Sequence, residues 1–178
     1  MRSRGQEGFT LIEVIVVAGI IAILAGILVP IIFKEIDESK ITRASADVRS
    51  ISSAMIVFKK DVGPWPTVDG ACASGLTLLV GNGNMPADYA AQGFDDSTGL
   101  NFSVPLSTNT AGCYTNWKGP YIALVSADPW GYAYITNAKE FNTPNAPIWI
   151  LSAGPNGRVE TNIASTSVLG DDIGLRLK

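Results

Sequence analysis

The sequence of 178 residues contains no histidine. Serine and cysteine triads of the common kind are therefore excluded, although a serine–lysine or a carboxylate mechanism stays open. Two glycine-rich segments, residues 81–84 (GNGN) and 154–157 (GPNG), lack the lysine and hydroxyl residue of a phosphate-binding loop. We interpret both segments as turns and predict that the chain is not an enzyme.

Positive charge is also scarce, because 13 lysines and arginines stand against 16 aspartates and glutamates and the formal net charge is −3. The first eight residues hold two of the arginines and one glutamate, so the rest of the chain carries −4. The sequence contains no basic stripe. Nucleic acid and anionic lipid surfaces are therefore not expected as partners of the exposed part.

Residues 9–33 contain no lysine, arginine or aspartate, and Glu13 is their only ionisable side chain. A helix of this length reaches across a bilayer core of ~30 Å at ~1.5 Å per residue. The segment is therefore predicted to span a membrane once. Arg2 and Arg4 precede it, and the preference of basic flanks for the cytoplasm places the long C-terminal part on the other side.

An ordinary secretory signal fits this segment poorly, because its apolar core runs to Phe33 and Lys34 without a small-residue cleavage site. A plain membrane anchor is the alternative. Glu13 favours more than anchoring, since a carboxylate within a span costs roughly 2.5 to 3.5 kcal/mol on insertion scales and needs a partner. Removal of residues 1–8 would give Phe9 a cationic α-amino group four residues before Glu13.

Beyond Lys34 the apolar residues recur at intervals of three and four, the pattern of an amphipathic helix. Together with the apolar segment they predict one helix from Phe9 to about Lys60, about 52 residues and roughly 78 Å long. Pro30 should bend or loosen this helix without ending it, whereas Gly63 and the prolines after it should end it. The stripe to be covered by the rest of the chain comprises Ile41, Ala44, Val48, Ile51, Met55 and Phe58.

The rest of the sequence predicts an irregular region followed by strands. Residues 69–116 are rich in glycine, asparagine, serine and threonine and are expected to form turns and loop, with room for a short helix. Within them Asp95 and Asp96 are interpreted as solvated turn residues and not as a metal or catalytic pair. One face of a small sheet would cover the helical stripe, which gives an α+β domain. Its antiparallel strands are predicted at residues 121–125, 132–135 and 148–151.

The chain has two cysteines, Cys72 and Cys113. Both follow the predicted span and so are expected outside the cytoplasm, where disulfides persist. A bridge between them would close a loop of about 42 residues and stabilise the fold by roughly 4 kcal/mol in the chain-entropy model. A metal pair is the alternative, disfavoured by the lack of histidine and of a Cys-x-x-Cys spacing.

The N-terminus is a short basic leader that ends in Gly8 and is followed by Phe-Thr-Leu-Ile-Glu. It resembles the class III signal of type IV pilins and of type II secretion pseudopilins. The resemblance implies that a prepilin peptidase cleaves between Gly8 and Phe9 and that Phe9 becomes N-methylated. It also implies that the apolar helix serves as membrane anchor and polymerisation helix, with Glu13 meeting the amine of a neighbouring subunit during assembly.

Five segments further along narrow the resemblance to the major pseudopilins of type II secretion. The match covers about the first sixty residues and these islands, of which DPWG and DDIG are the most specific. The segments are residues 63–67 (GPWPT), 117–121 (WKGPY), 128–131 (DPWG), 152–157 (SAGPNG) and 171–174 (DDIG).

In that family a C-terminal loop holds a calcium ion, and the resemblance assigns this cofactor to four residues here. Asp171 and Asp172 match carboxylate ligands, and Ala153 takes the place of a backbone-carbonyl ligand. Asn156 replaces the acid of the family's turn, so it can offer an amide oxygen but no charge, and weaker calcium affinity is expected. The alternative is a pair of aspartates that only caps or solvates a turn.

The resemblance divides the chain into a cleaved leader (residues 1–8), a membrane-spanning polymerisation helix (9–33) and a globular α+β domain in the periplasm or outside the cell (34–178). The implied fold is type IV pilin-like, with the long helix packed on a small antiparallel sheet. The implied location is the bacterial inner membrane, with one span, and a filament after assembly.

The implied function is that of a structural subunit of a pseudopilus, which drives type II protein secretion across the outer membrane. The implied partners are copies of the chain, minor pseudopilins, the prepilin peptidase, the inner-membrane assembly platform with its ATPase, and membrane lipid before assembly. A type IV pilin for adhesion or motility is one alternative. A membrane-anchored glycan-binding ectodomain is another, and it would use Trp65, Trp117, Trp130 and Trp149.

Overall fold

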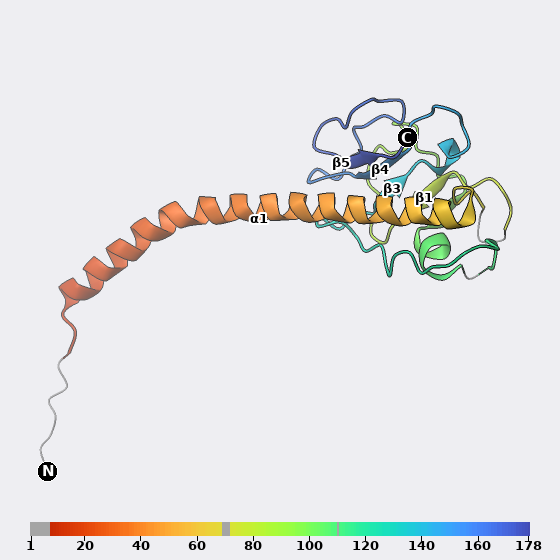
Figure 1. Cartoon of the computed structure of the whole chain (residues 1–178). Helices are drawn as coiled ribbons and strands as arrows, with labels where there is room; N and C mark the ends of the chain where they lie inside the picture. Colours follow the sequence, from red (N-terminus) through yellow and green to blue (C-terminus); the bar gives the residue numbers. More distant parts are fainter. Residues whose placement is uncertain (1–7, 69–71, 110) are drawn as a thin grey trace, which may run out of the picture. The chain divides into compact units, whose positions relative to one another are not determined.

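The structure, a computed structural model, describes residues 8–68, 72–109 and 111–178. It separates into two compact units, Met1–Ser39 and Lys40–Lys178. The predicted leader lies outside the described residues except for Gly8. The first unit contains the N-terminal part of helix α1, and the second contains the rest of α1 and the strands of the described chain (Figure 1).

α1 (Leu11–Val62) is one helix of 52 residues, as the periodicity predicts. Pro30 lies within it and does not end it. By length and composition α1 is able to cross a membrane, and the apolar side chains of its N-terminal part are exposed. The helix ends where expected: Gly63 has a φ of +99°, and its N–H donates to the carbonyl of Lys59 at 2.9 Å. Glycine adopts this left-handed terminus without a Cβ clash.

The second unit is built on a five-stranded sheet with the order β2-β1-β3-β4-β5. β1 and β2 run parallel, and the remaining neighbours are antiparallel. The α+β class is therefore confirmed, with a mixed sheet in place of the predicted antiparallel one. The elements are β1 (Leu78–Val80), β2 (Gly99–Asn101), a π-helical turn η1 (Val104–Thr108), β3 (Ile135–Thr136), a 3-10 helix η2 (Ala138–Glu140), β4 (Trp149–Ser152) and β5 (Ile173–Arg176).

The strand predictions hold for the middle of the sheet. β4 matches the strand predicted at residues 148–151, and β3 overlaps the end of the one predicted at 132–135. β1 and β2 lie in the segment expected to form turns and loop, and no strand was predicted where β5 lies. Short strands such as these show too little alternation of apolar and polar residues to be recognised unless, as in β4, their residues are mainly aromatic or β-branched.

The strand predicted at residues 121–125 is wrong, because the chain there is irregular. The N–H of Tyr121 donates to the carbonyl of Leu106, and the carbonyl of Val125 accepts the N–H of Asn82. These single hydrogen bonds go to different neighbours, so no ladder forms along the segment. The aromatic and β-branched composition instead reflects packing of this segment against the core.

Both faces of the sheet are covered, and α1 covers one of them (Figure 1). Along β4 the side chains alternate, so that Ile150 joins the core that contains Phe58 of α1, while Trp149 joins a second core. The second core is completed by residues from loops, among them Phe94 and Val159. Loops therefore cover the face of the sheet that a second layer of helices covers in α/β domains.

The helical stripe predicted to face the core is confirmed except at its first position. From Ala44 to Phe58 its five members are at most 2% exposed, whereas Ile41 is 42% exposed. Ile41 lies next to the start of the second unit, before the turns of α1 that the sheet covers. The long helix on a small sheet agrees with the type IV pilin-like fold that the resemblance implies.

Candidate functional site

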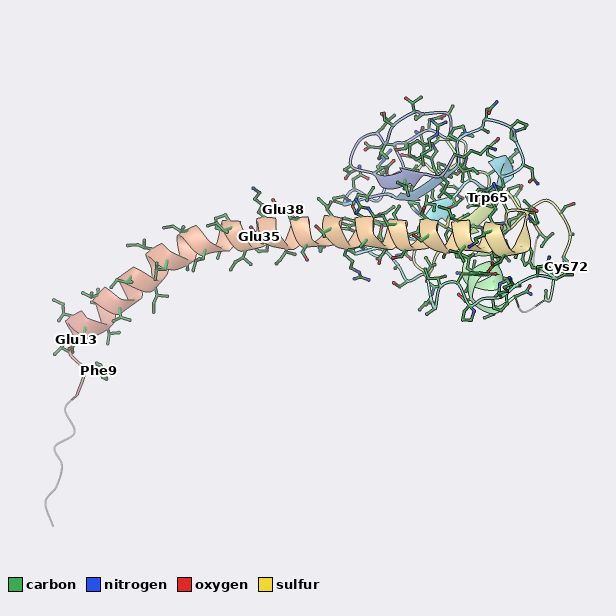
Figure 2. The ribbon with its side chains drawn as sticks, viewed as in Figure 1. Phe9, Glu13, Glu35, Glu38, Trp65 and Cys72 are labelled. Carbon is green, nitrogen blue, oxygen red and sulfur yellow. A yellow bond between two sulfur atoms is a disulfide. The ribbon has the colours of Figure 1, made fainter. Side chains whose placement is uncertain are left out.

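Phe9 and Glu13 lie together at the start of α1 (Figure 2). The Glu13 carboxylate accepts hydrogen bonds from the backbone N–H of Thr10 at 2.8 Å and from the Thr10 hydroxyl at 2.7 Å. The N–H of Glu13 donates to the Thr10 hydroxyl in return at 3.4 Å. This arrangement is a capping box, which satisfies backbone donors that the start of a helix leaves without a partner.

Sequence reasoning assigned Glu13 to assembly and missed the role of Thr10. The Thr-x-x-Glu spacing before an apolar run is the signal that identifies such a cap. Glu13 is thus hydrogen-bonded by its own helix, while Phe9 is 88% exposed. Cleavage between Gly8 and Phe9, and contact of Glu13 with another subunit, stay predictions.

The first unit carries a continuous apolar surface. Between Phe9 and Phe33 the large apolar side chains are 50% to 88% exposed. Exposed apolar surface of this extent requires lipid or another apolar surface to cover it. The segment is therefore suited both to a bilayer and to packing against other helices.

The C-terminal loop, residues 153–172 between β4 and β5, holds the carboxylate of Asp172 in a buried position. The residue is 7% exposed. Its Oδ2 accepts the N–H of Thr161 at 2.6 Å and the N–H of Glu160 at 2.9 Å. Its Oδ1 is buried and has no hydrogen-bond partner. Burial raises the pKa of Asp172 above its usual range, and the hydrogen bonds from Thr161 and Glu160 oppose that rise.

Asp171 lies against the turn of residues 154–157. Its Oδ2 accepts the N–H of Asn156 at 3.1 Å, while its Oδ1 is buried without a hydrogen-bond partner. Gly154 has a φ of +62°, and a Cβ at this position would lie 2.1 Å from the carbonyl oxygen of Asp171. Glycine is therefore required for the close approach of the two segments. The structure brings the turn that contains Ala153 and Asn156 next to the Asp171–Asp172 pair.

Two buried carboxylate oxygens without hydrogen bonds, one on Asp171 and one on Asp172, are the observation that bears on a cation. Such oxygens are unfavourable by themselves, and Ca²⁺ takes carboxylate, amide and backbone oxygens as ligands. The amide oxygen of Asn156 accepts the N–H of Arg158 at 2.6 Å, which leaves one lone pair for an ion. The residues present therefore fit an oxygen-coordinated cation.

Side-chain carboxylates alone do not complete such a site. Within the described part of the chain, no three histidine, cysteine, aspartate or glutamate side chains form a group that could hold a metal ion. An ion at Asp171 and Asp172 would therefore depend on the amide oxygen of Asn156 and on backbone carbonyls, with that of Ala153 as the predicted one.

Glu160 belongs to this loop and was missed by sequence reasoning. Its Oε2 accepts the N–H of Asp171 at 3.0 Å. A Cβ at Gly170 would lie 1.3 Å from the same oxygen, so Glu160 occupies the space that the glycine leaves open. No motif contains Glu160, and only the folded loop brings it to Asp171.

Cys72 and Cys113 form the predicted disulfide, with their Cα atoms 5.2 Å apart. Asp95 and Asp96, interpreted as solvated turn residues, each have a partner within the protein. Asp95 lies 3.1 Å from Lys139 Nζ, and Asp96 accepts the hydroxyl of Tyr89.

The tryptophans proposed for a glycan site are mainly part of the cores. Trp65 is 7% exposed and stacks on Phe141, and Trp149 is 2% exposed. Trp117 donates its Nε1–H to the carbonyl of Pro105 at 2.7 Å. These three side chains therefore pack in or against the cores of the domain, and Trp130 is half-buried.

Comparison with known proteins agrees with the resemblance seen in the sequence. Residues 3–29 match the family described as the prokaryotic N-terminal methylation motif. The chain is 31% identical over 157 residues to type II secretion system core protein G of Escherichia coli K12, a match that covers 88% of this chain and 86% of that protein. It is 29% identical over 161 residues to the protein of the same name from Pseudomonas aeruginosa, with 89% of each covered.

A more distant likeness extends to pili. The toxin coregulated pilin of Vibrio cholerae is 35% identical over 106 residues, which cover 58% of this chain and 47% of the pilin. No solved structure matches the chain significantly. The similarity to core protein G therefore covers far more of the chain than the similarity to a pilin does.

Proposed function

This chain belongs to the family of type II secretion system core protein G, the major pseudopilins, and we propose that it is a structural subunit that polymerises into a pseudopilus. The apolar part of α1 is stored in the inner membrane and then packs against the same part of other copies. The second unit lies in the periplasm, and the growing pseudopilus drives proteins across the outer membrane. Prepilin peptidase, minor pseudopilins and the assembly platform with its ATPase are the partners in this proposal.

The observation that carries this proposal is the exposed apolar surface of residues 9–33 with one carboxylate, Glu13, at its start. Within lipid, Glu13 relies on the hydrogen bonds from Thr10. Cleavage after Gly8 would create an amine on Phe9, and the amine of a neighbouring subunit would give Glu13 a cation in a medium of low dielectric constant. A carboxylate paired there is stabilised relative to one in lipid alone, so correct axial docking is favoured.

Substitution of Glu13 by alanine tests this role. We expect Glu13→Ala to be processed and inserted in the membrane but to give few or no pseudopili, because the amine of Phe9 loses its partner. Electron microscopy and immunoblotting of sheared fibres measure the outcome. Glu35→Ala, which removes a carboxylate from the same helix beyond the apolar segment (Figure 2), should leave fibres intact. Normal fibres from Glu13→Ala would contradict the proposal.

We also propose a calcium ion at Asp171, Asp172, Asn156 and the carbonyl of Ala153. The buried, unpartnered oxygens of the two aspartates support it. The ion would supply positive charge to these oxygens and join the turn of residues 154–157 to the start of β5. Calcium binding would then stabilise the second unit rather than perform catalysis, in line with a structural role for the chain.

Removal of calcium tests the metal site. We expect chelation by EDTA to lower the unfolding temperature of the full chain in detergent, because an ion that binds only the folded state stabilises it by mass action. Thermal unfolding followed by circular dichroism, with EDTA and with added CaCl₂, measures the shift. Asp172→Asn should abolish the difference between the two conditions. An unchanged unfolding temperature of the unmodified chain would remove calcium from the proposal.

A type IV pilin function is the second candidate, favoured by the match to toxin coregulated pilin. The two functions differ in what deletion of the gene affects. A pseudopilin deletion should stop secretion of folded proteins into the medium, whereas a pilin deletion should remove surface filaments and leave secretion intact.

A further inference from the structure

Asp128 is a buried carboxylate at the centre of a hydrogen-bond network, with the residue 4% exposed. Its Oδ1 accepts the N–H of Tyr132 at 2.8 Å and the N–H of Trp130 at 3.0 Å. Its Oδ2 accepts the hydroxyl of Ser152 at 2.6 Å. Asp128 therefore closes the turn of residues 128–132 and reaches the last residue of β4.

Ser152 continues the network towards the C-terminal loop. It is fully buried, and its backbone pairs with Ile173 of β5. Its hydroxyl donates to Asp128 and accepts the N–H of Gly154 at 3.2 Å. The hydroxyl thus has a fixed orientation, because its proton is committed to Asp128 and its lone pair faces Gly154.

The N–H of Gly154 belongs to the same peptide unit as the carbonyl of Ala153. A trans peptide is planar, so its N–H and C=O point in opposite directions. The hydrogen bond from Gly154 to Ser152 therefore sets the direction of the Ala153 carbonyl. The Ala153 carbonyl therefore points to the side of the turn opposite to Ser152.

We propose that Asp128 and Ser152 are positioning residues for the calcium site, which aim the Ala153 carbonyl at the ion. This inference rests on the proposed calcium site. Partners behind the direct ligands commonly fix ligand orientation, and their loss typically weakens metal binding about 10-fold to 100-fold. The aspartate of the DPWG segment and the serine of the SAGPNG segment then orient the same carbonyl together, although they lie 24 residues apart.

Ser152→Ala tests the inference in the full chain purified in detergent. Isothermal titration calorimetry with CaCl₂ should give a calcium dissociation constant at least about ten times that of the unmodified chain. The gain in unfolding temperature between EDTA and CaCl₂ should shrink in parallel. A merely structural role would lower the unfolding temperature equally in both conditions and leave the dissociation constant unchanged, and that result would overturn the inference.

Tyr134→Phe is the matched control, since it also removes a buried hydroxyl that donates to an aspartate, Asp47, at 2.9 Å. It should lower stability without changing calcium affinity. Asp128→Asn is the second variant if Ser152→Ala does not fold. It keeps an oxygen for Trp130 and Tyr132 but presents an amide donor to Ser152, so weaker calcium binding is expected from it as well.

The same titrations separate this inference from the calcium site itself. If the unmodified chain binds no calcium, the proposed site and its positioning residues are both wrong. If the unmodified chain binds calcium and both variants bind it equally well, the site stands and the positioning role of Asp128 and Ser152 is overturned.

Discussion

Asp95 is a surface carboxylate held in its charged form by its neighbours. The N–H of Ser97 donates to its Oδ1 at 2.9 Å, and Lys139 Nζ lies 3.1 Å from its Oδ2. Hydrogen bonds from Ser97 first, and then Lys139, lower the pKa of Asp95 from 3.8 to about 2. A carboxyl group whose pKa is lower in the folded than in the unfolded state stabilises the fold above the unfolded pKa, and this stability is lost as the pH falls through the folded pKa.

We therefore expect Asp95→Asn to unfold at a lower temperature than the unmodified chain near neutral pH. The difference should shrink as the pH falls from about 4 to about 2, because Asp95 of the unmodified chain then takes up its proton. Thermal unfolding in detergent, followed by circular dichroism along this pH series, measures the effect. Asp37→Asn, which removes a negative charge from the first unit, is the control for the change in net charge. A difference that stays constant down to the lowest pH would contradict the assignment.

At the level of single residues, the sequence alone identifies a side chain whose chemistry differs from that of its neighbours in the chain. Glu13 is the one ionisable side chain in an apolar segment, and that alone identified it as a candidate for a role in assembly. Glu160 and Ser152, in contrast, do not differ in this way from the residues beside them in the sequence. Their contacts with Asp171 and Asp128 depend on the folded chain, so no local pattern could reveal them.

The loop that contains Ala87 and Asp88 is attached to the C-terminal loop by backbone hydrogen bonds and by an ion pair. The N–H of Ala87 donates to the carbonyl of Gly157 at 2.8 Å, and the N–H of Val159 donates to the carbonyl of Ala87 at 2.9 Å. Arg158 Nη2 and Nε lie 2.6 and 2.8 Å from the same oxygen of Asp88. Two segments far apart in sequence are therefore joined at one place.

We expect Asp88→Ala and Arg158→Ala each to speed hydrogen exchange at the amides of Ala87 and Val159, because the ion pair holds the two segments together. A double-mutant cycle on the free energy of unfolding should give a coupling of about 0.2 to 1 kcal/mol, the range of partly exposed ion pairs. The longer pair of Lys118 and Asp61, at 3.8 Å, is the control and should give a smaller coupling. Zero coupling between Asp88 and Arg158 would show that the backbone bonds alone hold the segments.

Among the elements, helix α1 was predictable because its pattern repeats over many turns. Its 52 residues and its end before Gly63 follow from hydrophobic period and from glycine and proline. β1 and β2 were not predictable, because each has three residues and their parallel pairing joins segments about twenty residues apart. Such pairing is decided by partners elsewhere in the chain.

For the molecule as a whole, the disulfide between Cys72 and Cys113 is the covalent constraint on the second unit. It joins residues 41 positions apart, and segments of both flanks pack on the core that includes Phe58. Cross-linking of this kind stabilises chiefly by restricting the unfolded chain, typically by 2 to 4 kcal/mol.

We expect replacement of both cysteines by serine to lower the free energy of unfolding by about 2 to 4 kcal/mol without changing the calcium dissociation constant. Chemical denaturation in detergent and calorimetric titration measure the two quantities. The unmodified chain treated with a reducing agent is the control and should match the variant. Equal stability of variant and unmodified chain would mean that the bridge does not constrain the unfolded state.

The sequence by itself determined the long helix α1, the single carboxylate in its apolar N-terminal part, the apolar stripe on its second half and the place where it ends. These features depend on residues near one another in the chain, whose hydrophobicity, periodicity and charge specify where the helix forms and where it ends. The tertiary structure decided which short strands pair, how loops close the second face of the sheet, and how Asp128 and Ser152 come to stand behind the Ala153 carbonyl. Those arrangements depend on contacts between distant residues, whose energies arise only when the chain has folded.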